Sequence, residues 1–363
     1  MANIVSSSDQ PAPKEEGSSP TAKTRFPPNM EQLLHLQDPE LMMHWCTTTY
    51  RSMARDQATE TLWQMTIPLL SLQFPALRHG ILALSAVQLA QDTSNPAQKE
   101  RYLLSAREHQ SRALAGFRLD SVENLTSTQC NAAFAMCCIL VVYPFAYCLI
   151  DEPNVEDEER PRVLDRLLEV FEVTHRLKGA MTRMIDRVAS GELCPLVRAD
   201  LTRPAMIDMS QLIISALRTR NAVEAKQNPS HERGVYEQTL QHLRYSLEQV
   251  MGGGEPKDSA FCWAFSIPVR FLALLREREP LALVVWAHYV VVLHYMHHSV
   301  WMGIWGRRIL KEIADCLYPE WQRMIIWPIE ATGCLVPELM LALIANQRED
   351  DVDQWPPYVS ADY

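Results

Sequence analysis

Residues 75–91 read PALRHGILALSAVQLAQ, and the second half of this stretch is apolar almost all round. Pro75 suits the first turn of a helix, where the backbone amide needs no partner. A helix without a polar face has to be covered by other elements on every side. This stretch therefore predicts a buried central helix that is surrounded by further helices.

Two longer apolar runs extend this pattern. Residues 132–150 carry no charged side chain, and residues 281–306 carry none if histidine is neutral. Both runs are long enough to cross a membrane. However, Pro144 interrupts the first run, four histidines fall in the second, and neither run has the Lys/Arg bias that orients a span. We therefore expect no membrane span and interpret both runs as buried helices.

Start and stop signals around these runs predict amphipathic helices. Asn95 and Pro96 begin one that runs to Leu119, and residues 252–254 (three glycines) end another. The other predicted helices cover residues 59–73, 127–143, 161–188, 204–221, 269–276, 280–298, 304–317, 320–327 and 337–347. Alternating patterns with paired turn signals, which are typical of strands, are missing. The sequence predicts an all-α protein with a single multi-helix domain of roughly ten or more helices.

The two ends of the chain differ in composition from the middle. Residues 1–30 are rich in Ser, Pro, Lys and Glu, which cannot bury enough apolar surface to offset the entropy of ordering. Residues 348–363 are acidic and contain prolines. We expect a disordered tail at residues 1–30, an all-α domain at residues 31–347 and an acidic tail at residues 348–363.

The charge and the cysteine content argue against several classes of protein. Among 363 residues, 44 are acidic and 34 are basic, which gives a net charge of −10. Proteins that bind nucleic acid through a broad surface usually carry the opposite balance, so we expect no direct nucleic-acid contact. The nine cysteines form no CxxC pair, which disfavours a zinc ribbon or finger and suits a reducing, intracellular setting. The sequence contains neither of the glycine-rich nucleotide-binding motifs GxGxxG and GxxxxGK[ST], and it lacks the GxSxG motif of α/β-hydrolases.

Large aromatic residues are concentrated in the last third of the chain. Such residues can line an apolar cavity between helices, although a plain aromatic core has the same composition. The residues that we expect to form a ligand pocket are Trp286, Tyr289, His294, Trp301, Trp305 and Trp327.

Two clusters have the residue types of a metal site. His294 and His298 are one helical turn apart, but a site would need a third ligand, and packed histidines are the favoured interpretation. An acidic segment offers carboxylates for Mg²⁺ in a stretch broken by proline, where a solvated loop is favoured. The alternative metal ligands there are Asp151, Glu152, Glu156 and Asp157. We expect no catalytic residue, no metal and no cofactor.

Three stretches together suggest a family. They are HLQDPELMMHWCTTTYRSMA with PALRHGILALSAVQLA (residues 35–54 and 75–90), HQSRALAGFRLDSVENLTSTQCNAAFAMCCILVVYPFA (109–146), and the segment from IPVRFLALLREREPLALVVWAHYVVVLHYM to LYPEWQRMIIWP (267–328). In this order they resemble the C-terminal regulatory domain of fungal zinc binuclear cluster transcription factors, especially the sterol uptake control regulators.

The chain departs from that family at its N-terminal end. Members carry six cysteines there, which hold two zinc ions and place a helix in the DNA major groove. Residues 1–45 of this chain contain no cysteine. The chain therefore resembles the regulatory domain alone, and an upstream exon that encodes a zinc cluster is an open alternative.

The resemblance implies an all-α ligand sensor and dimerisation module in transcription control. The implied ligand is lipid-like or a small apolar molecule, and the implied pathway makes sterols or secondary metabolites. The implied protein partner is a DNA-binding factor or a second copy, with a location in the nucleus or shuttling to it. The alternative is an all-α enzyme of secondary metabolism that acts on a terpenoid or polyketide intermediate.

Overall fold

A computed structural model describes residues 37–118, 122–150, 162–198, 207–303 and 305–334. Contacts divide the chain into two units, Met1–Asp38 and Pro39–Tyr363, and every helix from Trp45 onward belongs to the second unit. The predicted tails and the predicted helix at residues 337–347 lie outside the described residues.

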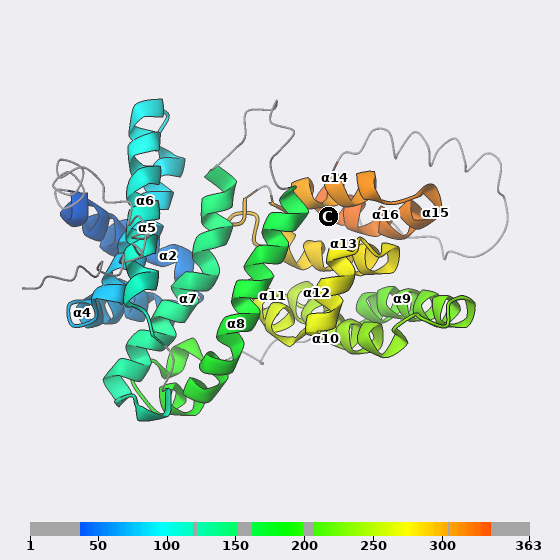
Figure 1. The fold of residues 1–363 in the computed structure, drawn as a ribbon, viewed down its shortest axis with the longest axis horizontal. Coiled ribbons are helices and arrows are strands. Elements are labelled where there is room, and N and C mark those ends of the chain that lie inside the picture. Colours follow the sequence, from blue (N-terminus) through cyan, green and yellow to red (C-terminus); the bar gives the residue numbers. More distant parts are fainter. Residues whose placement is uncertain (1–36, 119–121, 151–161, 199–206, 304, 335–363) are drawn as a thin grey trace, which may run out of the picture. The chain divides into compact units, whose positions relative to one another are not determined.

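The described part of the chain consists of helices and the turns between them, and it contains no strand (Figure 1). More than ten helices are present among these residues, so the predicted all-α class is confirmed. The hydrophobic core is built from residues of almost every helix.

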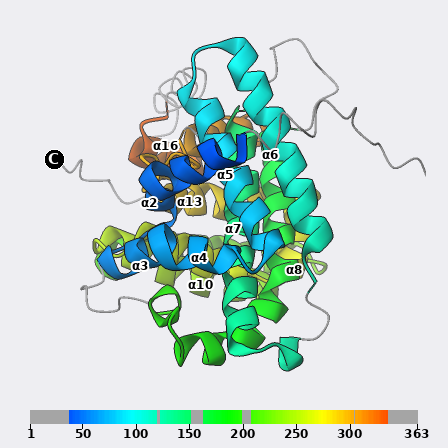
Figure 2. The same cartoon turned by 90° about the vertical axis from the view of Figure 1, so that its left-hand side faces the viewer.

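The N-terminal helices form a layer of short segments that faces the viewer in Figure 2. Their bounds are η1 Trp45–Thr49, α2 Tyr50–Met53, α3 Gln57–Thr61, η2 Leu62–Thr66 and α4 Ile67–Ser71. Asp56 caps α3 by accepting a hydrogen bond from the Thr59 amide at 2.8 Å. The π-helical turn η2 ends two residues before Pro68. The nitrogen of Pro68 carries no hydrogen, so it cannot donate the usual hydrogen bond of an α-helix.

The helix expected from residues 75–91 is α5 (Pro75–Asp92), and it is central. It packs along α6 (Pro96–Gly116) and crosses α7 (Ser127–Ile150). Gly80 lies at the crossing with α7: a Cβ there would stand 2.8 Å from the Met136 sulfur and 3.4 Å from Ile139 Cγ2. A side chain at position 80 would therefore have to displace the end of the Met136 side chain and would press on Ile139.

Replacing Gly80 with valine is expected to lower the free energy of unfolding by about 1–3 kcal/mol, because the branched side chain overpacks the crossing. Urea unfolding measures the change. Gly234→Val is the matched control, since a Cβ at this helical glycine meets nothing within 4 Å. Equal stability of the two variants would contradict the tight crossing.

The helix α7 runs through Pro144 to Ile150, so the prediction that it ends near Pro144 is wrong. Proline removes a single backbone hydrogen bond, and the residues beyond it remain packed. Phe145, for example, is buried, and its carbonyl accepts a hydrogen bond from the Trp305 indole at 3.1 Å. Tertiary packing therefore outweighs the local signal that proline gives.

One helix among the described residues is long and apolar enough to cross a membrane, Ser127–Cys148 within α7. Of its most apolar window, 83% is buried inside the protein, where it packs on α5 and α8 (Val163–Ala189). Two further helices meet the test only as a pair that is bent by 89°. These findings are compatible with the expected absence of a membrane span.

The remaining helices pack on the other side of α8 (Figure 1). Their bounds are α9 Ile207–Gln227, α10 Arg233–Met251, α11 Pro256–Ser266, α12 Val269–Arg276, α13 Pro280–His294, α14 Trp305–Cys316, α15 Pro319–Gln322, η5 Arg323–Ile325 and α16 Ile326–Thr332. Two 3₁₀ turns lie apart from this group: η3 Val122–Asn124 precedes α7, and η4 Cys194–Leu196 contacts α3 and the end of α8. Every residue of α13 from Leu281 to Leu293 is buried, as its apolar sequence predicts.

The helix α13 ends at His294, four residues before its predicted end. The amides of Met296 and His297 bond to carbonyls three residues back, which tightens the chain into a series of turns. His297 and His298 are exposed, whereas Met296, Trp301 and Met302 are buried, so burial continues through single side chains and not along a helix. These turns bring Trp301 back toward the N-terminal helices.

Candidate ligand-binding site

An apolar cavity of about 170 Å³ lies where the N-terminal layer meets α7, α8 and α11. Its apolar walls come from segments that are far apart in the sequence. They are Met53, Trp63, Phe134, Cys138, Val141, Val142, Met181, Leu196, Phe261, Phe265 and Trp301. Three charged residues, Arg55, Lys257 and Asp258, complete the lining.

One face of α7 forms a wall of the cavity. Phe134, Cys138, Val141 and Val142 follow each other at spacings of four, three and one, which places them on one side of the helix. Burial raises the pKa of the Cys138 thiol to about 12. This cysteine therefore contributes as an apolar side chain and not as a thiolate nucleophile.

Helix α11 supplies both an apolar and a charged part of the lining. Phe261 and Phe265 are one turn apart, and Phe261 stacks on Trp301 with ring centroids 5.9 Å apart. The Trp301 indole donates a hydrogen bond to the Ser52 carbonyl at 3.1 Å. This bond fixes the ring against the end of α2, so the wall is held by three separate segments.

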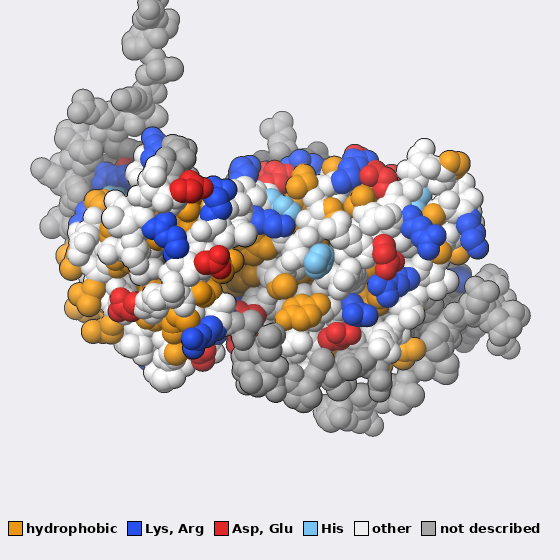
Figure 3. Space-filling model, turned by 90° about the horizontal axis from the view of Figure 1, so that it is seen from below, with side chains coloured by type: hydrophobic (Ala, Val, Ile, Leu, Met, Phe, Trp, Pro, Cys, Tyr) orange, Lys and Arg blue, Asp and Glu red, His pale blue; other side chains and the backbone are white. Residues whose placement is uncertain are grey.

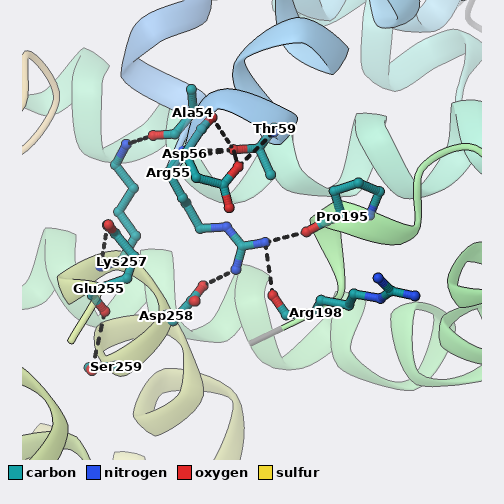
Figure 4. Close-up of polar contacts among 10 residues, drawn as sticks. All are labelled: Ala54, Arg55, Asp56, Thr59, Pro195, Arg198, Glu255, Lys257, Asp258 and Ser259. Atoms are coloured by element: carbon teal, nitrogen blue, oxygen red, sulfur yellow. Dashed lines mark hydrogen bonds and ion pairs between the residues drawn. The ribbon is translucent and has the colours of Figure 1, made fainter. Parts of the chain in front are cut away.

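Arg55 forms hydrogen bonds to three neighbouring residues at the charged end of the cavity; Figure 4 shows these contacts. Its guanidinium donates to a carboxylate oxygen of Asp258 and, at 2.6 Å and 3.3 Å, to the carbonyls of Pro195 and Arg198. The side chain is only 13% exposed. A planar guanidinium with several donors can bridge such partners, which a lysine ammonium does less well.

Lys257 lies next to the Arg55 contacts, and its ammonium donates a hydrogen bond to the Ala54 carbonyl (Figure 4). Burial lowers the pKa of Lys257, the Arg55 charge adds to this shift, and the Glu255 and Asp258 carboxylates oppose it. Glu255 uses a carboxylate oxygen to cap the amide of Lys257 at 3.3 Å at the start of α11. The cavity is thus apolar over most of its wall and charged at one end.

The six aromatic and histidine residues expected to form a pocket do not come together. Only Trp301 of this set lines the cavity. Trp286 and Tyr289 lie in a closed aromatic cluster with Phe171, Trp263 and Phe271.

The other three members of the set lie elsewhere. The Trp305 indole is bonded to the Phe145 carbonyl, and Trp327 stacks on His288 at 5.6 Å. His294 stacks on His297 at 4.6 Å, and burial lowers its pKa. Contact between these residues and a ligand stays a prediction.

Four of the fourteen cavity residues, Lys257, Asp258, Phe261 and Phe265, were not singled out by the sequence because α11 was not among the predicted helices. Two signals for it are present: the glycines at residues 252–254 end α10, and Glu255 with Pro256 forms a helix start. Recognising α11 would have drawn attention to Lys257 and Asp258 in its first turn.

Within the described ranges, no three His, Cys, Asp or Glu side chains are placed to hold a metal ion. The alternative metal ligands Asp151, Glu152, Glu156 and Asp157 lie outside these ranges. Their role stays a prediction, and so does the enzyme alternative that depends on them.

On the face shown in Figure 3, acidic and basic side chains are interspersed.

No protein-family model matches the chain, and no curated protein matches it either.

Proposed function

We propose that the chain is a non-enzymatic regulator of transcription whose all-α domain senses a small apolar molecule. The observation that carries this proposal is the cavity of about 170 Å³ with largely apolar walls. A dry apolar cavity of about 150 Å³ is enough to hold benzene. The part of the proposed ligand that this space encloses therefore has one or two rings.

The position of the cavity suits a sensor. Its walls join the N-terminal layer, α7, α11 and the turns after α13, so a ligand there would stabilise the packing between these segments. The regulatory role itself comes from the resemblance to zinc-cluster factors. On this proposal a DNA-binding factor or a second copy is the partner, and the protein works in the nucleus or shuttles to it.

Filling the cavity is expected to abolish ligand binding. Cys138→Phe adds a ring to the α7 wall, so cinnamyl alcohol, a one-ring apolar probe, should bind at least about ten-fold more weakly than to the wild type. Isothermal titration calorimetry measures the affinity, and circular dichroism checks the helix content. Cys262→Phe, on the exposed side of α11, is the matched control and should bind like the wild type.

Two results would contradict the proposal. Equal affinity of both phenylalanine variants would show that the probe does not occupy this cavity. A tagged protein recovered neither in the nucleus nor together with a DNA-binding factor would refute the regulatory role.

A further inference from the structure

The charged end of the cavity indicates the chemical class of the ligand. This inference rests on the proposed function. Two cations, Arg55 and Lys257, line the cavity with a single carboxylate, that of Asp258. Asp258 is ion-paired with Arg55, which neutralises one of the two cations. The second cation is left without a carboxylate of its own on the cavity wall.

Lys257 is the cation that remains. Its ammonium has three donors, and one of them is bonded to the Ala54 carbonyl. Glu255 accepts a hydrogen bond from the backbone amide of Lys257 through one carboxylate oxygen, and it does not line the cavity. Among the described residues, Lys257 forms no ion pair within 4.0 Å, although the Glu255 and Asp258 charges both act on it, so its ammonium keeps donors for a further anionic partner.

A half-buried cation that forms no direct ion pair is stabilised when an anionic partner bonds to it. An anionic group of the ligand would supply that partner in a charge-assisted hydrogen bond. The N-terminus of the eleven-residue helix α11 lies at the same end and adds a partial positive charge, which the Glu255 cap offsets in part.

We infer that the ligand is a small aromatic or terpenoid carboxylate, whose apolar body fills the space between α7 and α11 and whose carboxylate pairs with Lys257. The ring of such a ligand would lie among Phe134, Phe261 and Trp301, which line the apolar part of the cavity. A neutral molecule of the same shape would fit the walls but would leave the ammonium unpaired.

Cinnamate and cinnamyl alcohol test this inference, because they differ in the charged group and share the same ring and chain length. In calorimetric titrations at pH 7, the wild type is expected to bind cinnamate about ten-fold or more tightly than the alcohol. Lys257→Met should remove this preference while the alcohol still binds. Lys257→Arg, which keeps the charge, should retain much of it.

Lys226→Met, at an exposed position on α9, is the matched control and should leave the preference unchanged. Equal affinities of the wild type for both probes would overturn the inference and leave ligand binding in place. A preference that survives Lys257→Met would overturn it as well. If neither probe binds the wild type, the proposed function and this inference both fail.

Discussion

Replacing Phe171 with alanine is expected to lower the free energy of unfolding by about 3–5 kcal/mol, the range for removing a buried aromatic ring. Phe171 on α8 is 1% exposed, and its ring meets those of Trp263, Trp286 and Tyr289 edge-on, with centroids 5.7–5.9 Å apart. Each such contact adds stability beyond the buried area itself.

The neighbours of Phe171 have little freedom to close the space that alanine would leave. Trp263 and Tyr289 stack on each other with centroids 3.9 Å apart, and the Tyr289 hydroxyl donates to the Ala260 carbonyl at 3.0 Å. These contacts fix α11 against α13. A cavity should therefore persist in the variant, which places the loss toward the upper part of the range.

Urea unfolding followed by circular dichroism measures this effect. Phe171→Leu keeps most of the volume and should cost clearly less than the alanine variant. Tyr318→Ala removes an aromatic ring that is 69% exposed and should change stability by no more than about 0.5 kcal/mol. A loss below about 1 kcal/mol for Phe171→Ala would contradict the packing of this cluster.

The helices that were predicted best are those whose composition alone determines their burial. The second half of α5 and α13 up to Leu293 are apolar almost all round, and both are buried as predicted, although α13 ends four residues before its predicted end. α11 was not predicted because it is short and because its aromatic residues lie on two different sides of the helix. Trp263 faces the closed cluster, whereas Phe261 and Phe265 face the cavity, so no single apolar stripe appears.

The candidate site was harder to predict than the fold, because a cavity is a property of tertiary packing. Its wall joins Met53 to Trp301 across most of the chain, and no local spacing encodes that proximity. The pocket predicted from the aromatic residues of the last third stays a prediction, and two of them, Trp286 and Tyr289, lie in a cluster of rings with Phe171. Composition does not say whether such rings fill the core, as Trp286 does, or border an open space, as Trp301 does.

Acid is expected to destabilise the protein through His288. This residue of α13 is 4% exposed, its Nδ1 donates to the Val284 carbonyl at 2.8 Å, and its ring stacks on Trp327. Burial lowers the pKa of His288 to about 4 from the ordinary value of 6.5, and the hydrogen bond opposes this shift. The folded protein therefore holds this histidine in its neutral form.

The unfolded chain binds a proton at His288 below about pH 6.5, and the folded chain does so only below about pH 4. Stability is thus fully present above the unfolded pKa and is lost as the pH falls between these two values. The loss from this one group is about 3 kcal/mol at pH 4, since each pKa unit corresponds to about 1.4 kcal/mol.

Comparing urea unfolding of the wild type and His288→Phe at pH 7.5 and pH 4 isolates this contribution. Phenylalanine keeps a ring against Trp327 and cannot take up a proton, so the variant should lose about 3 kcal/mol less than the wild type on acidification. His298→Phe, at an exposed histidine, should follow the wild type. If the wild type and His288→Phe lose stability in parallel, a neutral His288 does not link folding to pH, and the acid sensitivity of the core must come from other groups.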